Sequence, residues 1–214
     1  TMESMFEGAT DFNQNLNTWG YGGDELKNLK SMFKDAKAFN NGGKPNEFPI
    51  GANSIKITDM SFMFSGAEAF NANVKWMITT NVTTMEGMFS YAKAFNKPLN
   101  TITYMIGQRK IGDSWDVSNV KNMRQMFNNA KAFNQPLNIW DTSNVTDMTN
   151  MFYNALKFNQ DISVWNVCNI VDSLYSHHNF FSKYSALEDI NKPTFAPIYS
   201  NDGPNLCDGG NPPT

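Results

Sequence analysis

Residues 115–138 read WDVSNVKNMRQMFNNAKAFNQPLN, and residues 140–163 read WDTSNVTDMTNMFYNALKFNQDIS. The two stretches start 25 residues apart and agree at their Trp-Asp, Ser-Asn-Val, Met-Phe and Phe-Asn-Gln positions. A fixed period of roughly 20 to 50 residues is typical of repeat proteins. The fold expected for this chain therefore follows from the repeat.

The phrase M-x-x-M-F-x-x-A-x-x-F-N occurs in six clear copies, and a degenerate seventh starts near Leu174. The six copies begin at Met2, Leu29, Met60, Met85, Met123 and Met148. Within a copy the apolar residues recur every three or four positions, which predicts a helix or helical turn. We call this run of apolar residues, from the first Met or Leu to the last Phe of a copy, the stripe. Ser118-Asn119 and Ser143-Asn144 precede it and are expected to cap its start. The segment after each Phe-Asn pair, which contains Leu137 in the fifth copy, is expected to be a strand of about four or five residues.

One such unit cannot bury its Met-Phe face alone, but stacked units cover one another. We therefore predict an α/β solenoid with one short strand and one helix or helical turn in each 25-residue coil. Equivalent residues of successive coils should then line up. The predicted column of core rings consists of Phe6, Phe33, Phe64, Phe89, Phe127 and Phe152.

An Asn follows the last Phe of every clear copy. These residues are Asn13, Asn40, Asn71, Asn96, Asn134 and Asn159. A single Asn at such a place is typical of an exposed turn. Six at one structural position favour a ladder in which each side-chain amide bonds to backbone groups of the next coil. We expect this structural role rather than ligand binding.

The period is lengthened in three places, since the Phe residues of successive Met-Phe pairs are 27, 31, 25, 38 and 25 residues apart. The two larger excesses fall within residues 41–54 and 101–114. In the second, alternating Ile102, Tyr104 and Ile106 followed by a Gly-containing turn predict a small hairpin. We expect residues 1–190 to form the repeat domain and the Pro- and Gly-rich residues 191–214 to form an irregular tail.

The chain has 214 residues, of which 41% are hydrophobic and 17% charged, and a net charge of −3. This composition suits one domain with a real core. The negative balance argues against a nucleic-acid surface, which is normally basic. No apolar run approaches the roughly 18 residues of a membrane span. Because the sequence begins inside a repeat, we expect it to be part of a longer chain, and a missing leader then says nothing about its destination.

No residue pattern points to a reaction. His177 and His178 are adjacent, so on a helix they point about 100° apart and make a poor metal pair. Motifs for a nucleophilic serine, a phosphate loop or a zinc protease are absent. We expect no enzymatic activity, no metal and no cofactor. Asn81 and Asn144 start formal glycosylation sequons, but a capping role is the expected one.

The two cysteines do not amount to a disulfide framework. Cys168 stands where Ser118 and Ser143 stand in earlier copies, and Cys207 lies in the tail. In an oxidising compartment the pair would fold the tail back over the last coil. The alternative, an incidental replacement and a free tail cysteine, stays open.

With these repeats identified, residues 1–175 resemble the BspA-like surface-protein repeat, W-D-x-S-N-V-x-x-M-x-x-M-F-x-x-A-x-x-F-N-Q-x-L. Residues 140–162 match it almost throughout. The resemblance implies a right-handed solenoid related to leucine-rich repeats, and a cell-surface or secreted location with a role in adhesion. It carries over no catalytic residue. The insertions and the seventh copy depart from the pattern, so the resemblance implies nothing about them.

We therefore predict a non-enzymatic repeat protein for adhesion or protein binding, without nucleic acid as a partner. The alternative is a structural subunit of a larger extracellular, shell or viral assembly, joined end to end through the open N-terminal coil. The longest insertion is the expected partner site, because long loops on rigid scaffolds carry function and aromatic and Arg residues anchor interfaces. Its candidate residues are Tyr104, Met105, Ile106, Arg109 and Lys110. An insertion that merely packs on its own coil remains the alternative.

Overall fold

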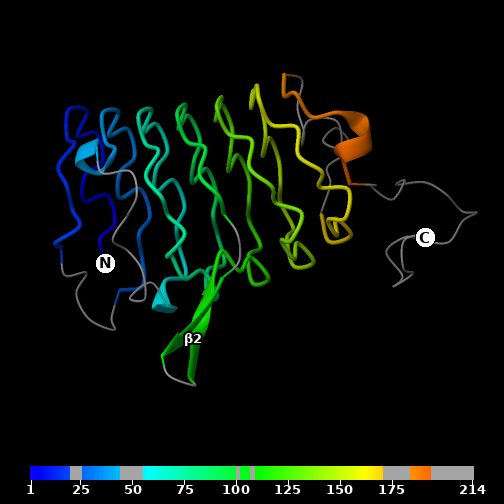
Figure 1. Cartoon of the computed structure of the whole chain (residues 1–214), viewed down its shortest axis with the longest axis horizontal. Helices are drawn as coiled ribbons and strands as arrows, with labels where there is room; N and C mark the ends of the chain where they lie inside the picture. The colour runs from blue at the N-terminus through cyan, green and yellow to red at the C-terminus, as the bar shows by residue number, and fades with distance from the viewer. Residues whose placement is uncertain (20–25, 44–54, 100–101, 107–108, 171–183, 194–214) are drawn as a thin grey trace, which may run out of the picture.

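The computed structural model describes residues 1–19, 26–43, 55–99, 102–106, 109–170 and 184–193. Successive copies of the repeat lie side by side in chain order, so the described chain winds through a row of coils (Figure 1). Its regular elements are the 3-10 helices η1 (Asn41–Gly43) and η3 (Asp189–Asn191) and the strands β1 (Ile102–Ile106) and β2 (Arg109–Ser114). Most of each coil is built from turns and extended segments.

The Met-Phe stripe forms a run of tight turns, and the predicted helix is not present in the described residues. In the fifth copy the N–H of Met126 bonds to the carbonyl of Met123, that of Asn128 to Gln125, and that of Ala130 to Phe127. Gln125 and Asn129 have positive φ angles of 55° and 57°. A left-handed residue interrupts an α-helix, because helical turns require negative φ throughout.

Every copy repeats this arrangement, with left-handed residues two and six positions after its first Met or Leu. They are Ser4, Gly8, Ser31, Asp35, Phe62, Gly66, Gly87, Tyr91, Gln125, Asn129, Asn150 and Asn154. The turns keep apolar residues on one side at the spacing of a helix, which is why the stripe resembled one in sequence.

Alternate N–H groups of the stripe point to the next coil. Those of Met123, Gln125, Phe127 and Asn129 bond to the carbonyls of Asp147, Thr149, Met151 and Tyr153, at 2.8, 2.9, 2.8 and 2.6 Å. The earlier junctions have the same four bonds. Every second peptide group of the stripe therefore lies along the row of coils, with N–H toward the later coil and C=O toward the earlier one.

Parallel pairing between coils is one residue wide and precedes the stripe. Single bridges join neighbouring members of the series Asn28, Asp59, Thr84, Asn122 and Asp147. The strand expected after the Phe-Asn pair is not formed in the described residues. There the chain turns instead, and the N–H of Trp140 bonds to the carbonyl of Leu137 at 3.1 Å.

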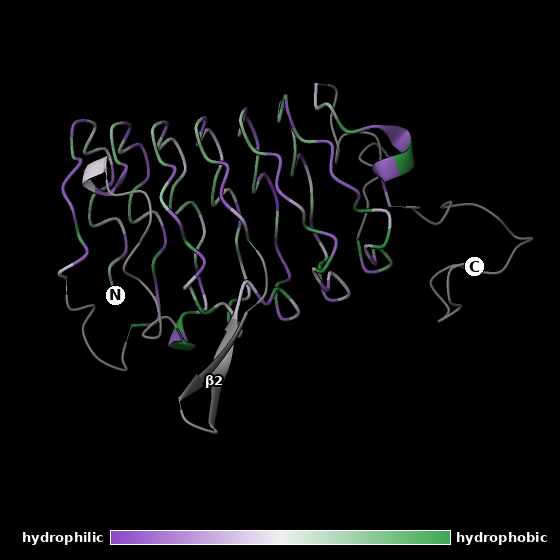
Figure 2. Ribbon diagram, in the orientation of Figure 1, coloured by the Kyte–Doolittle hydropathy of each residue, from purple (hydrophilic) through white to green (hydrophobic). Residues whose placement is uncertain are grey.

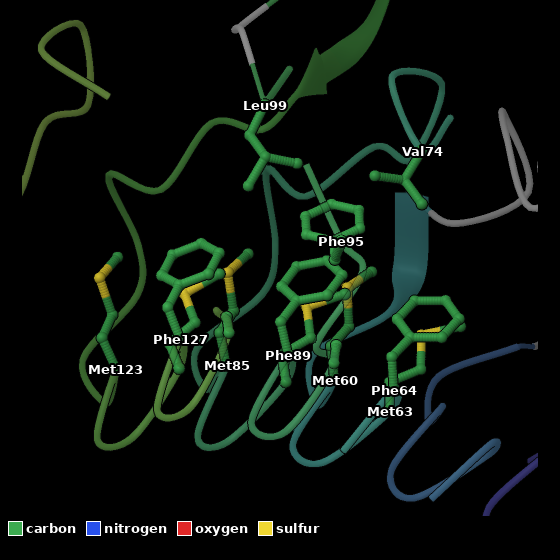
Figure 3. Packing of buried hydrophobic residues seen from close by; sticks show 14 of the residues in the cluster. Met60, Met63, Phe64, Val74, Met85, Phe89, Phe95, Leu99, Met123 and Phe127 are labelled. Atoms are coloured by element: carbon green, nitrogen blue, oxygen red, sulfur yellow. The ribbon is translucent and has the colours of Figure 1, made fainter. Parts of the chain in front are cut away.

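The core contains two parallel columns of Phe rings. Phe127 stacks on Phe89 at 5.7 Å and on Phe152 at 5.6 Å between centroids, and on Phe133 of its own coil at 4.1 Å. Phe133 in turn stacks on Phe95 and Phe158 of the neighbouring coils. Figure 3 shows Phe64, Phe89 and Phe127 in a row with Met60, Met85 and Met123 beside them. From the second copy onward these rings and methionines are fully buried.

Figure 2 shows that every coil contains both hydrophobic and hydrophilic segments. The Ala of the stripe, for example Ala130, is also fully buried in copies two to six. Burial of apolar surface is worth about 25 cal/mol per Å² and is the main term favouring the folded state. Because each coil buries its neighbour's face, this contribution is shared across all junctions.

The insertion within residues 101–114 forms an antiparallel hairpin of β1 and β2 that projects from one edge of the row (Figure 1). The register places Ile102 opposite Ser114 and Ile106 opposite Arg109, with an irregularity between Tyr104 and Met105. Most of the other insertion, residues 44–54, and of the expected seventh copy, residues 171–183, lies outside the described residues. Tail residues 194–214 lie outside them too.

Residues 184–193 cover part of the last described coil. The N–H of Ile162 bonds to the carbonyl of Asn191 at 3.0 Å, and Tyr153 meets Tyr184 edge to face. Leu187 is 6% exposed. The beginning of the expected tail, at Asn191, is thus in contact with the repeats.

Candidate protein-interaction site

The Asn residues after Phe form a continuous row of hydrogen bonds. The Oδ1 atom of each accepts the backbone N–H of the equivalent Asn in the next coil, at 2.8 to 3.0 Å. At the end of the row, Asn159 Oδ1 accepts the N–H of Glu188 at 2.9 Å. Gln135 and Gln160 donate their side-chain amides to the same oxygen atoms. These side chains join neighbouring coils.

A second row of amides links the coils at the Ser-Asn-Val positions. Asn119 Nδ2 donates to the carbonyl of Thr80, and Asn144 Nδ2 donates to that of Ser118, at 2.8 and 2.7 Å. Asn81 and Asn169 make the equivalent bonds. The expected capping role is therefore replaced by a bridging one, because no helix starts here. Both sequon asparagines, Asn81 and Asn144, use their side chains in this way.

The tryptophans also connect coils, which the sequence reading did not predict. The indole N–H of Trp115 donates to the carbonyl of Val74 at 3.0 Å, and that of Trp140 to Leu99 at 3.1 Å. Trp165 donates to Leu137 at 2.9 Å. All three rings are nearly or fully buried, so each indole N–H needs a partner. The recurrence of these tryptophans every 25 residues is the sequence feature that could have indicated an equivalent role in successive coils.

The base of the hairpin is anchored in the coils. Ser114 ends β2, is fully buried, and pairs with Ile78 as well as with Ile102. Trp115 follows it directly into the core. The far end of the hairpin, where Ile106 pairs with Arg109, is thereby held away from the coils (Figure 1).

The structure brings the five candidate partner residues together at the outer half of the hairpin. Met105 pairs with Lys110, Ile106 pairs with Arg109, and Tyr104 pairs with Gly112. The backbone positions are described, whereas the side chains of these residues lie outside the described part. The prediction that they contact a partner thus stays a prediction.

Three of the exposed apolar residues share one repeat position, two residues after Val74, Leu137 and Ile162. They are Trp76, Ile139 and Val164, with 38%, 55% and 68% exposure. The hairpin begins at the same position of the repeat, after Leu99. Lys75 lies over the Trp76 ring at 4.3 Å. The edge that carries the hairpin therefore also presents apolar side chains on other coils.

Charged side chains pair between coils on the surface. Lys34 Nζ lies 2.8 Å from Glu7 Oε1, and Lys93 Nζ lies 2.7 Å from Glu68 Oε2. The hydrogen bonds from Lys34 and from Ser4 hold the pKa of Glu7 below its usual value, and the hydrogen bond from Lys93 does the same for Glu68. Such exposed pairs contribute little to stability.

No group of three or more metal-binding side chains occurs among the described residues. His177 and His178 lie outside them. No helix in the described part of the chain is long and apolar enough to cross a membrane.

Cys168 is disulfide-bonded in the structure. Its N–H also bonds to Asn166 Oδ1 at 3.0 Å. The other cysteine of the sequence, Cys207, lies outside the described residues. The predicted role of this bond in holding the tail over the last coil stays a prediction.

The recurrent sequence and the recurrent contacts together define a repeat protein. The chain belongs to the family described as "Mycoplasma protein of unknown function, DUF285", whose model matches residues 1–48, 48–111 and 107–192. No curated protein and no solved structure matches the chain.

Proposed function

We propose that this chain is a non-enzymatic binding module of a cell-surface or secreted protein, and that it takes a protein partner at the edge from which the hairpin projects. The observation that carries the proposal is the placement of β1 and β2, the longest departure from the repeat, at one edge of the row of coils. Repeated coils give similar surfaces, whereas the hairpin is the only pair of strands among the described residues, and its sequence contains Tyr104 and Arg109. Long loops on rigid scaffolds tend to carry function.

The proposal also covers the class of fold and the relation to a known repeat family. We infer a right-handed solenoid of the leucine-rich-repeat kind that is related to the BspA-like repeats. The coil-to-coil hydrogen bonds and the stacked Phe columns support a solenoid. The BspA-like sequence pattern supports a role in adhesion at the cell surface.

A deletion tests the partner site. Removing residues 101–113 joins Asn100 to Ser114 and restores the 25-residue period between Phe89 and Phe127. The matched control removes six residues within 44–54, which restores the same period between Phe33 and Phe64. Each purified protein is used to capture surface proteins of the source organism, and the captured proteins are identified by mass spectrometry.

We expect the hairpin deletion to lose the partner that the full chain and the control capture, with nearly unchanged melting. Capture that survives the hairpin deletion would place the site on the regular coil surfaces. Collapse of the fold would show that the hairpin belongs to the core.

A structural subunit of a larger assembly is the second candidate function. It is favoured by the apolar side chains that the first coil exposes, Met5 at 47% and Trp19 at 41%. Native mass spectrometry distinguishes the two functions, because an assembly subunit forms an ordered polymer and a binding module does not.

A further inference from the structure

In the described part of the chain, the hairpin is joined to the coils only at the base of β2. β2 pairs with β1 on one side, and at its base Ser114 pairs with Ile78 of the coils on the other. Among the residues that the structure describes, nothing pairs with the outer edge of β1. An isolated two-stranded hairpin is marginally stable in water, and further strands stabilise it.

The residues of the open edge lack the usual protection against strand pairing. Natural proteins guard exposed edges with charged residues, especially Lys, or with Pro. β1 reads Ile-Thr-Tyr-Met-Ile and contains neither. The charged residues Arg109, Lys110 and Asp113 are all in β2, the strand whose last residue pairs with the coils. The register passes over Ile111, so the bulged residue also belongs to β2 and leaves β1 uninterrupted.

The sequence of β1 is nearly the same in both directions. When an antiparallel strand pairs with a copy of itself about its central residue, Tyr104 meets Tyr104, Ile102 meets Ile106, and Thr103 meets Met105. No charge is brought opposite a like charge in this arrangement. A self-complementary surface of this kind is what a two-fold symmetric dimer requires.

We propose that β1 pairs in antiparallel fashion with β1 of a second copy of this chain, with the two-fold axis at Tyr104. The product is a four-stranded sheet in the order β2-β1-β1-β2, which joins two coil stacks through their hairpins. Main-chain hydrogen bonds along the open edge supply the attraction, as in other cases of strand addition. This inference does not need an external partner, but it uses the strand that contains the proposed partner residues Tyr104, Met105 and Ile106.

The oligomeric state of the full chain tests the proposal by sedimentation equilibrium over a wide concentration range. We expect a reversible monomer–dimer equilibrium. Tyr104→Lys places two like charges opposite each other at the axis and should weaken the dimer by at least about tenfold, and Tyr104→Glu should do the same. An equimolar mixture of the two variants should recover dimerisation, because the charges at the axis are then opposite.

Lys110→Glu is the matched control, since it changes a charge in β2, and it should leave the dimer intact. Circular dichroism of each variant verifies that the coils are folded. A wild-type chain that is monomeric throughout, or a dimer that is unaffected by Tyr104→Lys, overturns the proposal. Capture of an external protein by a monomeric chain would favour the adhesion role and exclude self-pairing at β1.

Discussion

Asn96 Oδ1 accepts a hydrogen bond from the backbone N–H of Asn134 at 3.0 Å, across 38 residues that include the whole hairpin. The same bond between Asn71 and Asn96, which are 25 residues apart, is also 3.0 Å long. The 13 extra residues thus leave the contact between coils unchanged. The hairpin is an addition to the scaffold, and its removal should be tolerated on this ground.

Replacing Asn134 with Ala should destabilise the protein by about 1–3 kcal/mol, because the N–H of Asn159 loses its acceptor in a partly buried place. The free energy of unfolding from chemical denaturation measures this loss. Gln135→Ala should cost less, since Asn96 Oδ1 keeps its bond from Asn134. Gln14→Ala, an exposed position of the first coil, is the neutral control. Equal stability of Asn134→Ala and wild type would contradict the structural role of the row.

Phe127→Ala should cost about 3–5 kcal/mol, because it leaves a cavity in a column where the ring contacts Phe89, Phe133 and Phe152. Tyr91→Ala is the comparison, since Tyr91 is 50% exposed. Urea denaturation of both variants gives the two values. Similar losses at the two positions would argue against a core built from stacked rings.

Gly87→Ala should be strongly destabilising. Gly87 has a φ of 57°, and a Cβ atom there would lie 2.5 Å from the ring of Phe62 in the preceding coil. Left-handed strain and overpacking together predict a loss of roughly 2–4 kcal/mol.

Gly8→Ala is the matched control for Gly87→Ala. Gly8 has a φ of 73° but nothing within 4 Å of the added atom, so only the strain of about 1–2 kcal/mol remains. Thermal unfolding of both variants gives the difference. Truncating Phe62 to Ala should reduce the effect of Gly87→Ala, and additive losses would show that the two residues do not meet.

The ion pair of Glu7 and Lys34 predicts a small pH dependence. Because the pKa of Glu7 is lowered in the folded chain, its stabilising effect is present above the unfolded pKa and is lost as pH falls through the folded pKa. The melting temperature of wild type should therefore fall slightly more than that of Glu7→Gln between about pH 5 and pH 3. The pair is exposed, so we expect an effect of only a few tenths of a kcal/mol. If the melting temperature fell more in Glu7→Gln than in wild type, the pair would not stabilise the folded chain in the way that the lowered pKa of Glu7 predicts.

Peptide mapping without reduction should yield a cross-linked pair of peptides that contain Cys168 and Cys207, since the sequence has no third cysteine. Reduction should lower the melting temperature if the bond holds the tail against the last coil. Detection of two free thiols in freshly isolated protein would exclude the bond.

The sequence predicted which residues are buried better than it predicted the backbone that buries them. Apolar spacing of three and four reports a shared face, and turns with left-handed residues give the same spacing as a helix. A glycine such as Gly66 is compatible with a left-handed turn. Gln125 and Phe62 also adopt positive φ, and their residue types do not predict that conformation. The local preference of these residues is overridden by the hydrogen bonds between coils.

The row of Asn side chains was predictable because the same residue at one position of every clear copy indicates the same hydrogen bonds to the next coil. The partner site was predicted only as a segment, since the repeat marks the insertion around Tyr104 without stating what it contacts. The bonds of the Trp indoles were missed although the spacing of Trp140 and Trp165 was visible. A buried indole needs an acceptor, but the repeat pattern alone does not indicate which carbonyl lies within reach.

The peptide groups that lie along the row give the molecule a direction. Each stripe offers acceptors to the coil before it and donors to the coil after it. A further 25-residue coil placed at any junction would meet complementary groups on both sides, so such a chain can change length by whole coils without new chemistry. For the same reason two rows placed end to end can join only head to tail. Two-fold pairing of hairpins instead acts sideways, so combining both modes would produce a cross-linked mesh rather than a single filament.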